Sequence, residues 1–126
     1  MKVTQLVQVV IGAGIGGGLR YAVGGWVSER WGTSFPWHTF LINMSGAFLL
    51  GLLMALSLER DIGSPSLRLF LGVGVLGGFT TFSTLSYESI ALFERGLYAQ
   101  GAANMFGSAA LGLVAAFVGL AVGRAV

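Results

Sequence analysis

The sequence predicts an all-α membrane protein with four transmembrane helices, the third of which is broken in mid-membrane. Composition is the first reason: 55% of the 126 residues are hydrophobic and only 10% are charged, whereas soluble domains carry about a quarter charged residues. Long apolar segments between short polar ones are the second reason, and a polar, glycine-containing stretch inside one of them is the third. The length leaves room for a single domain over residues 1–126.

Each predicted helix begins or ends at a polar or turn-forming segment. A helix needs about 20 apolar residues to cross the hydrocarbon of a bilayer. We expect the first apolar segment to be a retained span, because no clear signal-peptide cleavage site follows it. Pro36 suits the start of the second helix, residues 59–66 form a polar loop, and Glu94-Arg95-Gly96 turns the chain into the fourth. The predicted spans are residues 4–27, 37–58, 67–93 and 97–123.

The most informative stretch of the chain is Gly77-Gly78-Phe79-Thr80-Thr81-Phe82-Ser83-Thr84 in the third predicted span. Adjacent glycines weaken a helix, and the hydroxyl side chains that follow compete with the backbone for hydrogen bonds. Lipid tolerates a non-helical backbone only where protein buries it or where it lines a polar cavity. The stretch therefore predicts a break in the helix and a functional site at that break.

Two polar side chains in the first two spans each have a functional and a structural interpretation. A charge such as that of Arg20 costs about 3 kcal/mol at the bilayer centre on insertion scales. Arg20 is either an anion attractor or a structural arginine that snorkels or bonds helix-end carbonyls, and its place past the middle of its span favours the structural role. Asn43 has two amide hydrogens, so it either donates to an anion or links helices. Beside a broken third span we favour the anion.

Further candidates lie in the third and fourth spans. The positive ring edge of Phe82 can stabilise an anion in a pore, although a phenylalanine in a membrane more often packs against lipid or protein. Ser83, Thr84, Asn104 and Ser108 add hydrogen-bond donors, and the last two lie four residues apart on one helix face. They form either a polar stripe along a pore or hydrogen bonds between helices.

The remaining titratable residues do not suggest catalysis. Glu88 is a proton carrier, a charge in a vestibule or a carboxylate that reaches the membrane surface, and we interpret Trp26, Trp37 and His38 as anchors at the membrane interface. The chain has no cysteine, metal cluster, Walker motif or nucleophile–base set, which argues against an enzyme. Its net charge of +2 is small and scattered, which argues against nucleic-acid binding.

The distribution of basic residues predicts insertion in both orientations. With four spans, both termini and the loop after the second span share one side of the membrane, and the positive-inside rule gives almost no preference. The basic residues are Lys2, Arg60, Arg68 and Arg124 on that side, and Arg20, Arg30 and Arg95 toward the other.

Small residues at helical spacing predict a homo-oligomer, most simply a dimer, because they let helix backbones approach closely. Glycine is frequent, with 21 residues in the chain against an average usage of about 7%. The small-residue sets are Gly12/Gly16, Ala47/Gly51/Ala55 and Ser108/Gly112.

Taken together, the chain closely resembles the Fluc (CrcB-like) family of fluoride channels along nearly its whole length. The segments that carry the resemblance are Gly16-Gly17-Gly18-Leu19-Arg20-Tyr21, Thr39-Phe40-Leu41-Ile42-Asn43, the stretch from Gly77 to Thr84, and Glu94-Arg95-Gly96. The resemblance implies a multi-pass channel of the cell inner (plasma) membrane that exports fluoride passively and lowers cytoplasmic fluoride. It implies an antiparallel, dual-topology homodimer with two fluoride pores in the lipid bilayer.

The resemblance also implies roles for individual residues. A central sodium ion at the dimer interface would be bound by the backbone carbonyls of Gly77 and Thr80 from each subunit. The implied pore residues are Asn43, Phe82, Ser83, Thr84 and Ser108.

The chain departs from the family pattern at two positions. The family usually has a second phenylalanine three residues after Phe82, where this chain has Leu85, which lacks a positive ring edge. Asn104 replaces an aromatic residue found in some relatives.

Two other classes of protein are compatible with four spans. A small multidrug antiporter would need a carboxylate in the first span, which is absent here, and a non-transporting assembly subunit would carry no ion.

Overall fold

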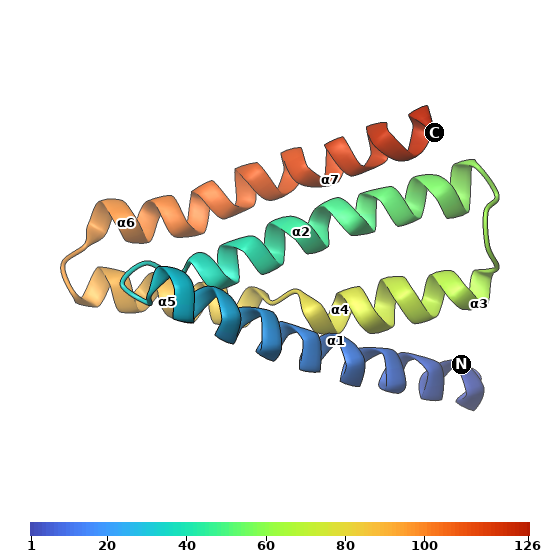
Figure 1. The fold of residues 1–126 in the computed structure, drawn as a ribbon, viewed down its shortest axis with the longest axis horizontal. Coiled ribbons are helices and arrows are strands. Elements are labelled where there is room, and N and C mark those ends of the chain that lie inside the picture. Colours follow the sequence, from blue (N-terminus) through green and yellow to red (C-terminus); the bar gives the residue numbers. More distant parts are fainter.

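The computed structural model describes residues 1–126, and its secondary structure consists of helices only. Four long, apolar helical rods run antiparallel to their neighbours in sequence (Figure 1), and each is long and apolar enough to cross a membrane. The predicted all-α architecture with four candidate spans is therefore confirmed. The first rod is α1 (Val3–Trp31), and the second joins α2 (Trp37–Met54) to the π-helical segment η1 (Ala55–Glu59).

The third and fourth rods each contain several helical segments. The third consists of α3 (Pro65–Arg68), the π-helical η2 (Leu69–Leu76), α4 (Gly77–Phe79) and α5 (Phe82–Glu94). The fourth consists of α6 (Tyr98–Ala102), the π-helical η3 (Ala103–Gly107) and α7 (Ser108–Ala125).

Sequence signals explain where the rods begin and end. The Ser64 hydroxyl accepts a hydrogen bond from the Leu67 amide at 3.0 Å and caps the start of the third rod. The first rod continues to Trp31, beyond the predicted end of its span at residue 27, and it ends at Gly32. Gly32 has φ 76°, a conformation that favours glycine at a helix C-terminus.

Glycines bring the rods into backbone contact within one protomer. Along α1, a Cβ on Gly12 would lie 2.7 Å from the carbonyl oxygen of Phe70, and one on Gly16 would clash with the backbone of the third rod. Along α2, a Cβ on Gly51 would clash with the carbonyl of Ala116 in α7. These glycines, from which the sequence predicts a homo-oligomer, therefore pack inside the protomer, and an oligomer must use other surfaces.

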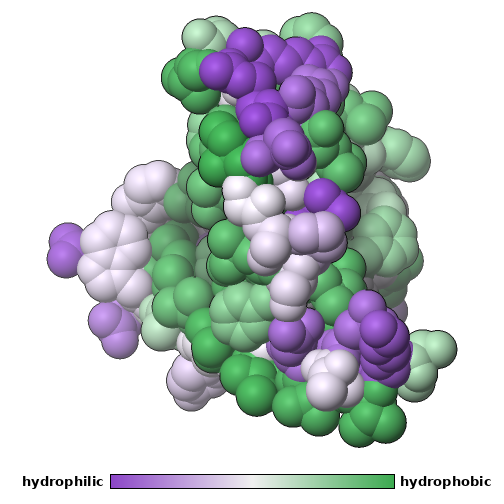
Figure 2. Space-filling model, turned by 90° about the vertical axis from the view of Figure 1, so that its right-hand side faces the viewer, coloured by the Kyte–Doolittle hydropathy of each residue, from purple (hydrophilic) through white to green (hydrophobic).

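Both chain termini and the loop between the second and third rods lie at one end of the bundle (Figure 1). Arg124 forms a bidentate ion pair with Glu59: its Nε donates to Oε2 at 2.7 Å and its Nη2 to Oε1 at 2.8 Å. Arg60 donates to the Arg124 carbonyl at 3.1 Å. Figure 2 looks onto this end, where hydrophilic side chains gather among hydrophobic ones. The basic residues of this end thus fix the C-terminus to the loop.

Most of the apolar side chains lie on the outside of the protomer. Only 21 of 126 residues are buried, and large hydrophobic residues on all four rods are exposed. Such a surface fits a protein covered by lipid or by a partner chain. The small apolar core consists of Val27, Ile42, Ala55, Leu85 and Leu92.

Candidate functional site

The helical hydrogen bonding of the third rod is interrupted at Thr80 and Thr81. Both residues have an extended backbone, with φ −81° and ψ 158° at Thr80 and φ −152° and ψ 121° at Thr81. The Thr80 hydroxyl donates to the Leu76 carbonyl at 3.0 Å, and the Thr81 hydroxyl oxygen accepts the Thr84 amide at 3.3 Å. Each threonine therefore caps one of the two helix ends that meet here.

Asn43 of α2 holds the extended backbone in place. Its Nδ2 donates to the Thr81 carbonyl at 3.0 Å, and its Oδ1 accepts the Thr81 amide at 2.9 Å. One turn later, a Cβ on Gly46 would clash with the Thr80 methyl group, so only glycine allows this close approach. Asn43, which the sequence predicts as an anion donor, thus uses two of its four hydrogen-bonding positions on Thr81. One of its amide hydrogens remains free to donate to an anion.

The interruption frees two backbone carbonyls. In a continuous helix the Thr81 amide would donate to the Gly77 carbonyl, and the Thr84 amide to the Thr80 carbonyl. Here the Thr81 amide donates to Asn43 and the Thr84 amide to the Thr81 hydroxyl. Gly77 and Thr80 therefore keep carbonyl oxygens without these helical partners, and carbonyl oxygens are ligands that hard cations accept.

The interruption also exposes the N-terminus of α5. The first amides of a helix, here those of Phe82 and Ser83, have no partner within it, and the helix dipole makes this end positive. Such an end attracts anions. The same short segment thus offers amide groups to an anion and carbonyl oxygens to a cation.

A groove of about 460 Å³ lies beside the interruption, between the third and fourth rods. The structure brings several predicted site residues together in its lining. They are Asn43, Gly77, Thr80, Phe82 and Ser108. Ser83 and Thr84 do not line this groove; Ser83 is exposed, and Thr84 lines a second hollow described below.

Phe82 and Leu85 both line the groove but differ in exposure. The Phe82 side chain is 69% exposed in the protomer, whereas Leu85 is 6% exposed. The ring of Phe82 therefore needs a partner chain or lipid to cover it. Leu85 belongs to the core of this protomer.

The fourth rod contributes two buried polar side chains with different partners. Asn104 Nδ2 donates to the Ser89 hydroxyl at 3.0 Å, and Ser89 donates to the Leu85 carbonyl at 2.8 Å. Asn104 thus links the fourth rod to α5, as the helix-linking interpretation predicts. The Ser108 hydroxyl is 4% exposed as a residue and has no partner, so it is free to contact a ligand in the groove.

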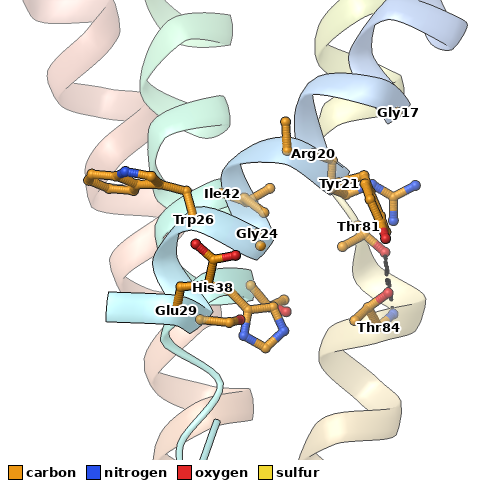
Figure 3. Close-up of a pocket in the computed structure, with 14 residues that line it drawn as sticks. Gly17, Arg20, Tyr21, Gly24, Trp26, Glu29, His38, Ile42, Thr81 and Thr84 are labelled. Atoms are coloured by element: carbon orange, nitrogen blue, oxygen red, sulfur yellow. Dashed lines mark hydrogen bonds between the residues drawn. The ribbon is translucent and has the colours of Figure 1, made fainter. Parts of the chain in front are cut away.

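A second, more polar hollow of about 770 Å³ lies on the other side of the interruption, against α1 and α2 (Figure 3). Its lining includes Arg20, Thr81 and Thr84. Thr81 lines both this hollow and the groove, so the two spaces meet at the extended residue. The Nε of Arg20 is buried without a hydrogen-bond partner, and its bond to a helix-end carbonyl, one form of the predicted structural role, is not observed at this atom.

His38 and Glu88 form an ion pair that the sequence does not suggest. His38 Nε2 lies 2.8 Å from Glu88 Oε2, and the two side chains are 23% and 19% exposed. His38, interpreted from sequence as an interface anchor, thus turns inward to α5. Trp26 and Trp37 remain exposed, as side chains that anchor a protein at the membrane interface would be. The guanidinium carbon of Arg30 lies over the Trp26 ring, 4.6 Å from its centroid.

Sequence reasoning missed two residues of this region. Thr81 lies within the Gly77–Thr84 stretch, and a threonine directly before a helix is a capping signal, but only the structure places it between two hollows. Ser89 carries no comparable signal, because its partner Asn104 is distant in sequence and lies on another rod.

Comparison with known proteins identifies relatives of the whole chain. Residues 7–120 match the family described as "CrcB-like protein, Camphor Resistance (CrcB)". A protein of Thermus thermophilus named "Fluoride-specific ion channel FluC" is 48% identical over 125 residues, which cover 99% of this chain and 98% of that protein. Proteins of the same name from Chloroflexus aurantiacus and Rhizobium meliloti are 42% and 44% identical, and the alignments cover 95% and 93% of this chain and 95% of each relative.

These matches extend from the first rod to the fourth, so the matched region spans the interruption. Because a family model covers most of the chain and relatives share 42% to 48% identity over nearly all of it, the protein belongs to the CrcB-like (FluC) family of multi-pass membrane proteins.

Proposed function

We propose that the protein is a passive, fluoride-selective ion channel, not an enzyme, and that it lowers cytoplasmic fluoride by letting the anion leave the cell. The observation that carries this proposal is the name shared by relatives that match nearly the whole chain, fluoride-specific ion channel. The chemistry of the interruption supports it. Fluoride is small and strongly hydrated, so neutral donors at close range must replace its water.

The proposed ion path runs through the polar hollow, past Thr81 and into the groove. Arg20 would raise the local anion concentration in the hollow. At the interruption, the remaining amide hydrogen of Asn43 and the free amides at the start of α5 would donate to the ion. Ser108, with its unpartnered hydroxyl, would continue the path along the groove, and the edge of Phe82 would face the ion.

Ser83 and Thr84 are the remaining proposed pore residues. The Thr81 hydroxyl donates to the Thr84 hydroxyl oxygen at 3.1 Å, which leaves the Thr84 hydrogen available to an anion in the polar hollow. Ser83 Oγ lies 3.4 Å from Thr81 Oγ1. The hydroxyls of Ser83, Thr81 and Thr84 thus form one hydrogen-bonded cluster, and an anion that moves along it would meet one hydroxyl donor after another.

The protein would act as an antiparallel homodimer inserted in both orientations. The exposed ring of Phe82 and the open groove beside it favour a second copy as the cover for this face, because a pore wall made of lipid could not exclude leakage. The two faces of the membrane receive nearly equal numbers of basic residues, as counted above.

Orientation can be tested by labelling. We expect a cysteine introduced into the 60–64 loop to react with membrane-impermeant reagent from both sides of the membrane. Labelling from one side only would contradict the antiparallel dimer and would remove the interface that the groove requires.

A sodium ion would bind where the two subunits meet, through the carbonyls of Gly77 and Thr80 from each. The freed carbonyls at the interruption fit this role, since both lack their helical donors. The ion would hold the two interruptions together. Replacing sodium by N-methylglucamine should therefore weaken the dimer; an unchanged dimer would argue against the site.

The central experiment is anion efflux from liposomes that contain the purified protein. We expect fluoride to leave quickly and chloride to be retained, with protein-free liposomes as the control. Equal leakage of both halides would contradict selectivity, and no leakage of either would favour a non-transporting assembly subunit.

A further inference from the structure

The His38–Glu88 pair has no role in the fluoride path proposed above. It joins the first turn of α2 to the middle of α5 through a 2.8 Å contact. The other nitrogen of His38, Nδ1, and the other carboxylate oxygen of Glu88, Oε1, are both buried and have no hydrogen-bond partner. Buried polar atoms without hydrogen-bond partners lower the stability of the fold. A pair with two such atoms therefore suggests a role other than stabilising the protomer.

The pair stands at the wall of the polar hollow. His38 lines that hollow together with Arg20, Thr81 and Thr84, and Figure 3 shows its ring near Glu29, with the two threonines across the hollow. Since Thr81 also lines the groove, an anion that reaches the interruption from this hollow passes the charge of the pair.

The charge of the pair depends on one proton. When the imidazole is neutral, its Nε2–H donates to the carboxylate and the pair carries a net charge of −1. When the imidazole is protonated, the pair is neutral and His38 Nδ1–H becomes an additional donor. Histidine is the side chain that changes charge between about pH 5 and 8, and His38 is the only histidine of the chain.

The other charges around the hollow do not obscure this change. Arg20 and Glu29 of α1 line the hollow and carry opposite charges that sum to zero. Tyr21, which also lines it, is uncharged in this pH range. Arg30 lies on Trp26, and Arg124 is paired with Glu59 at the terminal end of the bundle. The remaining titratable groups on the elements that pack against α2 and α5 are Tyr87, Glu94 and Tyr98.

We propose that His38 is a proton-dependent positioning residue for the anion path: its protonation cancels the charge of Glu88 at the polar hollow and speeds the entry of fluoride. This inference rests on the proposed channel function. It predicts that fluoride flux falls as the pH rises, because the hollow then gains a negative charge that repels the anion. By Coulomb's law, a unit charge at about 10 Å changes the local concentration of an anion by about two- to tenfold at the effective dielectric constants of protein surfaces and water.

The test is fluoride efflux from liposomes at pH 6 and pH 8, equal on both sides, with protein-free liposomes at each pH to measure unassisted leakage. We expect the wild-type protein to be two- to tenfold faster at pH 6. His38→Gln, which cannot be protonated, should be slow at both pH values. His38→Arg, which stays charged, should be fast at both, and it serves as a second variant if His38→Gln fails to fold.

Glu29→Gln is the matched control, because Glu29 is a carboxylate of the same hollow without a histidine partner in the structure. It should raise flux at both pH values and keep their ratio. A wild-type rate that is equal at pH 6 and pH 8 would overturn the inference, and so would a His38→Gln variant that keeps the wild-type ratio. Absence of fluoride flux at every pH and in every variant would instead overturn the proposed channel function itself.

Discussion

Helix α2 contacts the rest of the protomer through two faces that work differently. One face meets α7 through backbone contact at glycines, where a Cβ on Gly51 or Gly119 would clash with a carbonyl of the other helix. The other face meets the interruption of the third rod through the paired hydrogen bonds of Asn43. The first face is apolar packing between regular helices, whereas the second stabilises a backbone that is not helical.

The difference shows how a small membrane protein separates stability from function. Close apolar packing depends on shape and adds up over many weak contacts. The Asn43 face depends on two directional hydrogen bonds to Thr81, and these set the positions of the amides and carbonyls that we assign to ion binding. Changes on the first face should therefore act on folding, and changes on the second on flux.

The largest effect is expected for Gly51→Val on the packing face. The new side chain would clash with the Ala116 carbonyl, which is backbone and cannot move aside, so the helices must separate. Overpacking costs about 1–3 kcal/mol and more when backbones collide, and we expect no monodisperse protein on gel filtration. Gly107→Ala, which meets no neighbouring atom within 4 Å, is the control and should behave like the wild type.

Asn43→Ala should lower fluoride flux far more than it lowers the fraction of dimer. Losing both bonds to Thr81 frees the extended segment, and the amide hydrogen proposed to donate to fluoride is lost as well. A hydrogen bond to a charged group is worth about 1.5–3 kcal/mol, which corresponds to about a 10- to 100-fold loss of rate. Ser45→Ala, on the same helix with its hydroxyl bonded to the Leu41 carbonyl, is the control. If Asn43→Ala lost dimer and flux in parallel, the side chain would serve mainly to link helices.

The two faces also differ in how far sequence could predict them. The helices follow from apolar length and turn residues, and the interruption is visible as glycines followed by hydroxyl residues. Sequence marked Asn43 as an anion donor but gave no sign that its amide clamps Thr81, because the two residues are distant in sequence. The glycine pattern predicted close packing and not its partner, so glycines that pack within the protomer suggested an interface between subunits.

The same limit applies to the titratable residues. His38 and Glu88 belong to different rods, and each alone resembles a residue at the membrane surface. Only their 2.8 Å contact distinguishes a pair at the polar hollow from two independent interface residues. Pairings between distant polar residues are decided by three-dimensional packing, which one sequence does not reveal.

Phe82→Ile should lower fluoride flux by up to about tenfold, because isoleucine keeps the apolar wall but has no positive ring edge. The roughly 0.5–1.5 kcal/mol that pairs of aromatic rings gain beyond their area burial sets the scale of this effect. The ring is 69% exposed in the protomer, so little stability depends on it, and thermal unfolding of the variant should match the wild type. Undiminished flux would mean that the ring edge is not part of the ion path in this protein.

Leu85→Phe should have the smallest effect on flux and the clearer effect on stability. The sequence alone predicts that a second aromatic ring raises the fluoride rate or leaves it unchanged, with overpacking as the competing outcome. The structure favours overpacking, because Leu85 is 6% exposed and its carbonyl accepts the Ser89 hydroxyl, so a larger ring must displace core neighbours at a cost of about 1–3 kcal/mol. We expect a lower unfolding temperature with a fluoride rate close to that of the wild type. A variant that keeps its unfolding temperature and conducts faster would show that the groove has room for a second ring, and that Leu85 limits the rate of this channel.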